Sequence, residues 1–144
     1  MRRRMWVTGA ALALLAVAGC GTPQNGGPTA GYTNNVANLQ VKISGLRTDP
    51  CGTTQAAQIY GNCGRFVTEV SNTIVPLHDA LPTQGTVIDS MAAAVHTFQS
   101  MSCDTISGQP SAAQAQQCPQ ALVLIGTDLG KISPALASAP NPTP

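Results

Sequence analysis

The stretch AQQCPQALVLIGTDLGKISPAL, residues 115–136, decides the fold. Its apolar residues are separated alternately by three and four positions, which places their side chains on one face of an α-helix. Pro119 lies inside the stretch and should kink or break the helix, because proline lacks a backbone N–H. The residues of the expected apolar face are Ala115, Cys118, Leu122, Ile125, Leu129, Ile132 and Leu136.

Three earlier segments repeat this spacing, within residues 36–46, 56–81 and 87–101. Together with residues 115–136 they predict an all-α fold, a small up-and-down bundle of about four helices. Gly61 and Gly64 each cost about 1 kcal/mol of helix stability relative to alanine, so the second segment can also be two helices that meet there. The expected core residues are Val36, Leu39, Ile43, Leu46, Ala56, Tyr60, Cys63, Val67, Val70, Ile74, Leu77, Leu81, Val87, Met91, Ala94, Phe98 and Met101.

Local signals for helix ends agree with this division. Asp49 followed by proline suits an N-cap and a first helical position. Thr86 with Asp89, and Ser111 with Gln114, have the spacing of capping boxes. We therefore expect helix starts near these three positions.

The first 20 residues have the pattern of an export signal. Three arginines at positions 2–4 precede an uncharged, largely apolar run at residues 5–18, as in secretory signal peptides. This run is too short for a transmembrane helix, which needs about 20 apolar residues. Its end, Val17-Ala18-Gly19-Cys20, resembles the lipobox of bacterial lipoproteins.

The resemblance to lipoproteins covers only the leader and the cysteine that follows it. In that family the leader is cut before the cysteine, whose thiol carries diacylglycerol. It implies that Cys20 is the lipidated N-terminus and that the protein is anchored on the extracytoplasmic face of the cell membrane. Two or more acyl chains make such anchoring stable. With 9% charged residues and abundant Ala, Gly and Pro, the composition is similar to that of exported actinobacterial proteins, such as mycobacterial ones.

Four parts of the chain follow from these observations. We expect a lipoprotein signal peptide at residues 1–19 and a lipidated cysteine with a flexible tether at 20–31. A helical domain should occupy residues 32–137, and a disordered tail residues 138–144. The tether sequence after the cysteine, GTPQNGGPTAG, has no apolar side chain larger than alanine apart from its two prolines.

Charge narrows the range of partners. The chain without its leader would carry four basic and six acidic side chains, a net charge of −2. Without a basic patch we expect no nucleic-acid binding and no electrostatic binding to anionic lipid. The membrane partner is thus expected to act through the lipid on Cys20 alone.

The four remaining cysteines predict two disulfides, because an even number in an exported chain is typical of disulfide pairing. They are Cys51, Cys63, Cys103 and Cys118. The chain has no CxxC motif and no histidine at ligand spacing from a cysteine, so we expect no metal site.

The pairing of these cysteines depends on the register of the helices. An antiparallel hairpin of the second and third segments places Cys63 opposite residue 104, and all four thiols gather at one end of the bundle. We therefore predict Cys63–Cys103 and Cys51–Cys118. The competing scheme, Cys51–Cys63 with Cys103–Cys118, requires the second helix to begin only after Gly64.

Residues with catalytic chemistry are few. The same register brings His78 near Asp89 and Ser90, a combination used in acyl transfer, but no nucleophile elbow accompanies it. Tyr60 with His78 or His96 could ligate haem. Core and surface roles explain these residues more simply, so we expect no enzyme activity and no cofactor. Gly126 and the glycine four residues later more simply allow close helix packing than membrane dimerisation.

Two functions remain from the sequence. One is a non-catalytic, lipid-anchored cell-envelope lipoprotein that binds a protein partner or a wall component. The alternative is a carrier of a lipid or other hydrophobic ligand inside the bundle, favoured by Ala56, Ala94 and Ala115 and by the flexible side chains of Met91 and Met101.

Overall fold

The computed structural model describes residues 36–53, 55–106 and 108–140. These residues form an all-α fold with two disulfides, as predicted. The predicted leader, Cys20 and the tether lie outside the described residues, as do residues 141–144 of the tail. The helices are α1 (Val36–Arg47), α2 (Ala56–Ile59), α3 (Gly64–Ser71), α4 (Ile74–Ala80), α5 (Gly85–Ser100) and α6 (Ala112–Ala137), with short 3-10 turns η1 (Pro50–Gly52), η2 (Tyr60–Asn62) and η3 (Pro82–Gln84).

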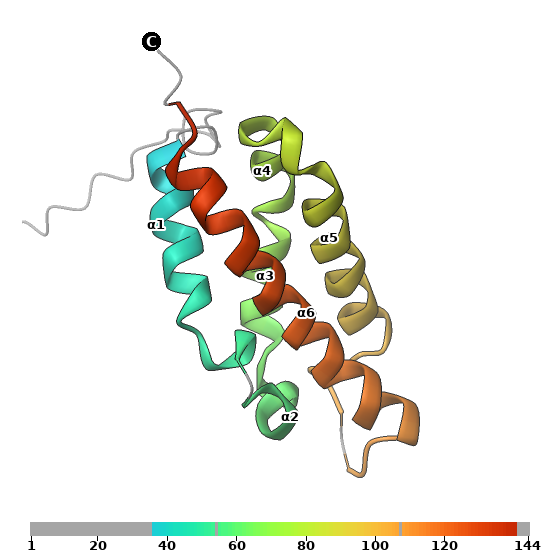
Figure 1. Ribbon diagram of the computed structural model, residues 1–144. Helices are drawn as coiled ribbons and strands as arrows, with labels where there is room; N and C mark the ends of the chain where they lie inside the picture. Colours follow the sequence, from blue (N-terminus) through green and yellow to red (C-terminus); the bar gives the residue numbers. More distant parts are fainter. Residues whose placement is uncertain (1–35, 54, 107, 141–144) are drawn as a thin grey trace, which may run out of the picture.

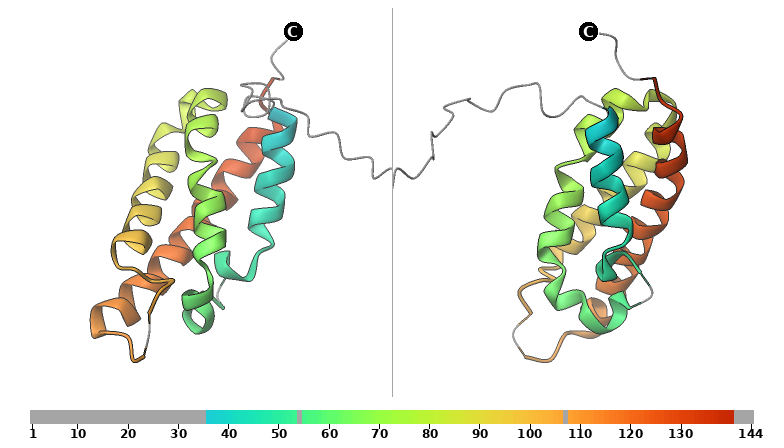
Figure 2. Two further views of the ribbon diagram at one scale, coloured as in Figure 1. Left: turned by 180° about the vertical axis from the view of Figure 1, so that it is seen from behind. Right: turned by 90° about the vertical axis from the view of Figure 1, so that its left-hand side faces the viewer.

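Four rods of helix lie side by side and alternate in direction: α1, the α3–α4 pair, α5 and α6 (Figure 1). The long helix α6 packs against both α1 and α5, while α3 and α4 pack against α1 and α5 from the opposite side (Figure 2). This is the expected up-and-down bundle. Among the described helices, none is long and apolar enough to cross a membrane.

The core consists largely of the predicted apolar faces. All four predicted residues of α1 are buried, and so are six of the seven predicted for α6. Ala115 is the exception on α6: it lies in the first turn of the helix and is exposed. On α5 the buried residue of the first turn is Ile88, whereas Val87 is only half-buried.

The second predicted segment is divided just before Pro76, which agrees with the helix-breaking effect of proline. One helix ends at Ser71 and the next begins at Ile74, so Pro76 lies in the first turn of α4, where its missing N–H costs little. The predicted break at Pro119 is wrong, because α6 runs through it. Pro119 has no N–H to donate to the carbonyl of Ala115, four residues earlier. Ala115 is exposed, so water can bond to this carbonyl instead.

Two of the three predicted caps are present. The Ser111 hydroxyl accepts a hydrogen bond from the Gln114 backbone N–H at 3.2 Å, and the Gln114 side chain accepts one from the Ser111 N–H at 3.0 Å. Asp49 Oδ1 accepts a hydrogen bond from the Cys51 N–H at 2.8 Å, although it caps the 3-10 turn η1. The cap expected at Thr86 is wrong, because α5 begins at Gly85 without a side-chain cap.

The four cysteines in the described part of the chain all form disulfides, but the predicted pairing is wrong. Cys51 bonds to Cys63 and Cys103 bonds to Cys118, each with the Cα atoms 5.7 Å apart. The helical register itself agrees with expectation, because a Cβ on Gly64 would meet the side chain of residue 104. The predicted pairing failed because η1, α2 and η2 turn the chain back on itself before α3 begins at Gly64. This turn brings Cys51 next to Cys63, the following cysteine in the sequence.

Close packing of α6 against η1 depends on glycine. A Cβ on Gly126 would overlap the backbone carbonyl of Gly52, whereas a Cβ on Gly130 would meet nothing within 4 Å. The packing role expected for Gly126 is therefore confirmed, and Gly130 takes no part in it.

Candidate functional site

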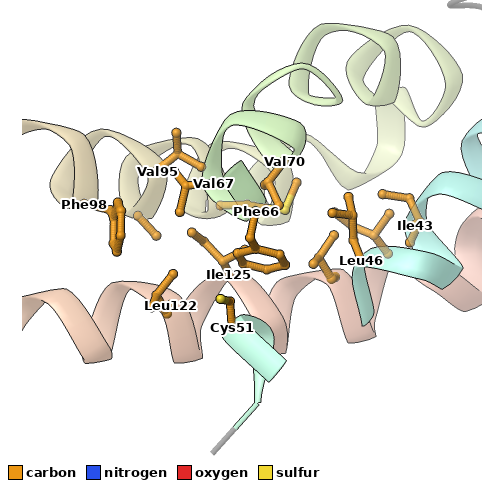
Figure 3. Close-up of a cluster of buried hydrophobic side chains, with 14 of the residues drawn as sticks. Ile43, Leu46, Cys51, Phe66, Val67, Val70, Val95, Phe98, Leu122 and Ile125 are labelled. Carbon is orange, nitrogen blue, oxygen red and sulfur yellow. The ribbon is translucent and has the colours of Figure 1, made fainter. Parts of the chain in front are cut away.

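A groove lies between α1 and α3 and has a volume of about 560 Å³. Its floor is formed by Leu46, Cys51 and Phe66, which belong to the edge of the core. Figure 3 shows the Phe66 ring and the Cys51 side chain directed toward one another, with Leu46 beside them. The volume falls within the roughly 300–1,000 Å³ typical of ligand-binding clefts. The walls and rim are formed by Val41, Lys42, Gly45, Asp49, Pro50, Ile59, Asn62, Arg65 and Glu69.

The local sequence explains why this side of the bundle is hollow. Gly45 supplies no side chain on the face of α1 that borders the groove, and a Cβ there would meet nothing within 4 Å. Val41, one turn earlier, extends into solvent and is 75% exposed. On the opposite wall, Ile59 and Asn62 lie where the chain passes from α2 through η2 rather than continuing as a regular helix.

An ion pair connects the two walls of the groove. Lys42 Nζ of α1 lies 2.8 Å from Glu69 Oε2 of α3, and both side chains are partly exposed. The hydrogen bond and charge of Lys42 hold the pKa of Glu69 below its usual value, and the positive charge of Arg65 adds to this shift. Both charges of this pair are thus compensated within the protein.

The other two charged residues of the groove differ in their partners. Asp49 accepts the hydrogen bond from the Cys51 N–H that starts η1. Arg65 lies one turn before Glu69 on α3, and its guanidinium forms no hydrogen bond or close ion pair with any other residue in the described part of the chain. Arg65 is therefore the cation of the groove that a ligand could pair with.

A second surface, the α6 face, carries no charge. It consists of Pro119, Gln120, Val123, Leu124 and Thr127, which line a shallow hollow. Val123 and Leu124 are 45% and 41% exposed. Beside it lies a further hollow between α5 and α6, lined mainly by alanine, threonine and glutamine.

The predicted contact between His78 and Asp89 is present. The Nε2 of His78 lies 3.1 Å from Oδ1 of Asp89, with the side chains 38% and 73% exposed. Among the described residues, Ser90 makes no hydrogen bond with this pair. The contact therefore joins the end of α4 to the start of α5 at the surface, without the nucleophile that acyl transfer requires.

Other candidates from the sequence are dispersed. Tyr60 lies in η2, just before the start of the α3–α4 rod, whereas His78 lies in α4 near the other end of that rod. His96 is exposed on α5. Within the described ranges, no three His, Cys, Asp or Glu residues come together as a metal site requires. The predicted lipidation site, Cys20, lies outside these ranges.

The sequence interpretation missed one unusual residue in α6. Asp128 is 1% exposed, its Oδ1 lies 2.9 Å from Lys131 Nζ, and its Oδ2 has no hydrogen-bond partner in the described structure. Its position three residues after Ile125, on the edge of the apolar face, was the only available signal. The interpretation also missed Lys42, Arg65 and Glu69 as neighbours, because they come from two helices.

Comparison with known proteins found no matching family model, no similar curated protein and no similar solved structure.

Proposed function

We propose that this protein is a non-catalytic, lipid-anchored lipoprotein of the cell envelope that binds a partner through the groove between α1 and α3. The lipobox-like Val17-Ala18-Gly19-Cys20 supports the anchor. The observation that carries the binding role is the groove itself, where an apolar floor meets an arginine with no hydrogen-bonded or closely ion-paired partner in the described structure. The partner is a protein or a wall component on the outer side of the cytoplasmic membrane.

The groove favours this function over a carrier of hydrophobic ligands. A carrier encloses its ligand in the bundle, yet Met91, which would line such a cavity, is fully buried in the core, and Ala94 borders only the surface hollow between α5 and α6. The groove lies at the surface and has four charged residues on its rim. A charged, solvent-accessible rim around an apolar centre is the usual composition of a protein-binding surface.

The anchor and the binding role are tested separately. Intact-mass measurement of the native protein should give a chain that begins at Cys20 and carries diacylglycerol. An unmodified thiol there, or protein found free in the medium, would refute the anchor.

Photo-crosslinking in intact cells tests the binding role. A photoreactive residue at position 41, in the groove, should give a discrete crosslinked product. The same residue at position 75, on α4 outside the groove, should not, although Val75 is nearly as exposed at 68%. Equal products from both positions would argue against the groove as the binding site.

A further inference from the structure

We infer that the groove binds a peptide segment of a partner protein in which an acidic residue lies next to apolar side chains, with Arg65 pairing with the carboxylate. This inference rests on the proposed binding function and specifies its ligand. It follows from the order in which charged and apolar residues occur along the groove.

The charged residues differ in whether they are available. Lys42 and Glu69 neutralise one another at 2.8 Å, at the level of the groove farthest from η1. The carboxylate of Asp49 caps η1 at the other end of the groove. Between them, Arg65 lines the groove with its guanidinium unpaired in the described structure, so a carboxylate is the complementary group. Glu69 lies one turn from Arg65 on α3 and its pKa is lowered by the Arg65 charge, but its carboxylate is bound to Lys42 at 2.8 Å, which leaves the Arg65 guanidinium without a hydrogen-bonded partner in the described structure.

Charge alone cannot hold such a ligand. An exposed arginine–carboxylate pair is weak, since water and salt screen it. The ligand therefore needs apolar contacts, which the exposed rim residues Val41 and Pro50 provide, together with the small accessible part of the floor of Leu46, Cys51 and Phe66. These residues lie around Arg65, so one short segment can reach both the floor and the guanidinium.

A peptide fits this composition better than a lipid or a free anion. A fatty acid would need an enclosed apolar channel for its chain, whereas this hollow lies between α1 and α3 at the surface with Asn62 and four charged residues on its walls and rim. A small inorganic anion would leave the apolar floor unused. A peptide uses the floor, the arginine and the polar rim together.

Selection from a display library of random twelve-residue peptides on the full chain tests the inference. We expect the enriched peptides to contain Asp or Glu beside Leu, Ile, Val or Phe. One enriched peptide, synthesised and titrated, should bind about fivefold more weakly to Arg65→Gln, and Arg65→Glu should enrich Lys- or Arg-containing peptides instead. The control Arg47→Glu should change neither result, because exposed Arg47 contacts Ser133 on the α6 side.

Two further measurements separate the roles of charge and apolar contact. Raising the salt concentration should weaken peptide binding to the natural chain more than to Arg65→Gln. Val41→Ser should weaken binding, while Val75→Ser, at a similarly exposed valine outside the groove, should not. Circular dichroism of each variant shows that the fold is retained.

Several results would overturn the inference. They are no enrichment of any peptide, enrichment without acidic residues, equal effects of the Arg65 and Arg47 variants, and a dimer of this chain that Val41→Ser dissociates. None of these bears on the lipid anchor, since the selection does not depend on Cys20. Conversely, an unmodified Cys20 would refute the anchor and leave the peptide inference intact.

Discussion

The contact between Gly126 of α6 and Gly52 of η1 allows a sharp test of the packing. In Gly126→Ala the new Cβ would overlap the carbonyl oxygen and carbon of Gly52. Both are backbone atoms, so no side-chain rotation relieves the overlap. The adjacent Cys51–Cys63 disulfide restrains η1, so α6 and η1 must move apart against it.

The size of the effect follows from two opposing terms. Overpacking of this kind costs about 1–3 kcal/mol, and the upper part of that range is expected where backbone must move. Alanine in place of glycine inside a helix stabilises the helix by about 1 kcal/mol. We therefore expect Gly126→Ala to lower the free energy of unfolding by about 1–2 kcal/mol, or Tm by roughly 3–10 °C for a domain of this size.

Gly130→Ala is the matched control, since it makes the same substitution one turn later in the same helix. A Cβ there meets nothing within 4 Å, so only the helix-propensity term remains. We expect this variant to be more stable than the natural chain by about 0.5–1 kcal/mol. The assay is urea unfolding of the full chain followed by circular dichroism, with both disulfides verified by mass. If Gly126→Ala proved as stable as Gly130→Ala, the close approach of η1 to α6 would be refuted.

Three other predictions follow from contacts of the fold. Lys42 lowers the pKa of Glu69 in the folded state, so the pair stabilises the fold fully above the unfolded-state pKa of ~4.3. This stabilisation is lost as the pH falls through the lower pKa of the folded state. In urea unfolding, Lys42→Ala should therefore destabilise the chain at pH 7 but not at pH 2. Ser111→Ala should cost about 1 kcal/mol through loss of the capping box, and an unchanged Tm would contradict the cap. Replacing Cys103 and Cys118 together by alanine should cost about 3 kcal/mol, and peptide mapping of the unreduced natural chain should recover these two cysteines in one linked fragment.

Much of the fold could be predicted from the sequence because burial in a helical bundle imposes its period on the apolar residues. Val36, Leu39, Ile43 and Leu46 form one buried stripe in α1, as their spacing predicts. The antiparallel register was also predictable, and the contact between His78 and Asp89 agrees with it. The helical core and the antiparallel register both depend on apolar spacing repeated over many residues, so a single residue that departs from the spacing does not change the prediction.

The disulfide pairing and the groove were not predictable in this way. Both depend on the path of residues 50–63, where short 3-10 turns and a single turn of α-helix replace the regular helix that the apolar spacing favoured. The ion pair of Glu69 with Lys42 depends on how α1 packs against α3, which no local pattern records. The role of Gly45 was not predictable from the sequence, because this glycine shapes the groove only by leaving it free of a side chain.

The placement of the two disulfides determines how the chain responds to force. Both cross-links lie in the half of the bundle that contains α2 and the start of α6 (Figure 1). At the other end, α1 begins at Val36 and is held by packing and by polar contacts such as the hydrogen bond from Gln40 to the Leu136 carbonyl, 2.8 Å. If the proposed lipid anchor holds the chain at a membrane, a pull on it would reach α1 first, and neither disulfide opposes the separation of α1 from α6. Each disulfide closes only a short loop, with its cysteines 12 and 15 positions apart, so packing and polar contacts hold the rods together under tension.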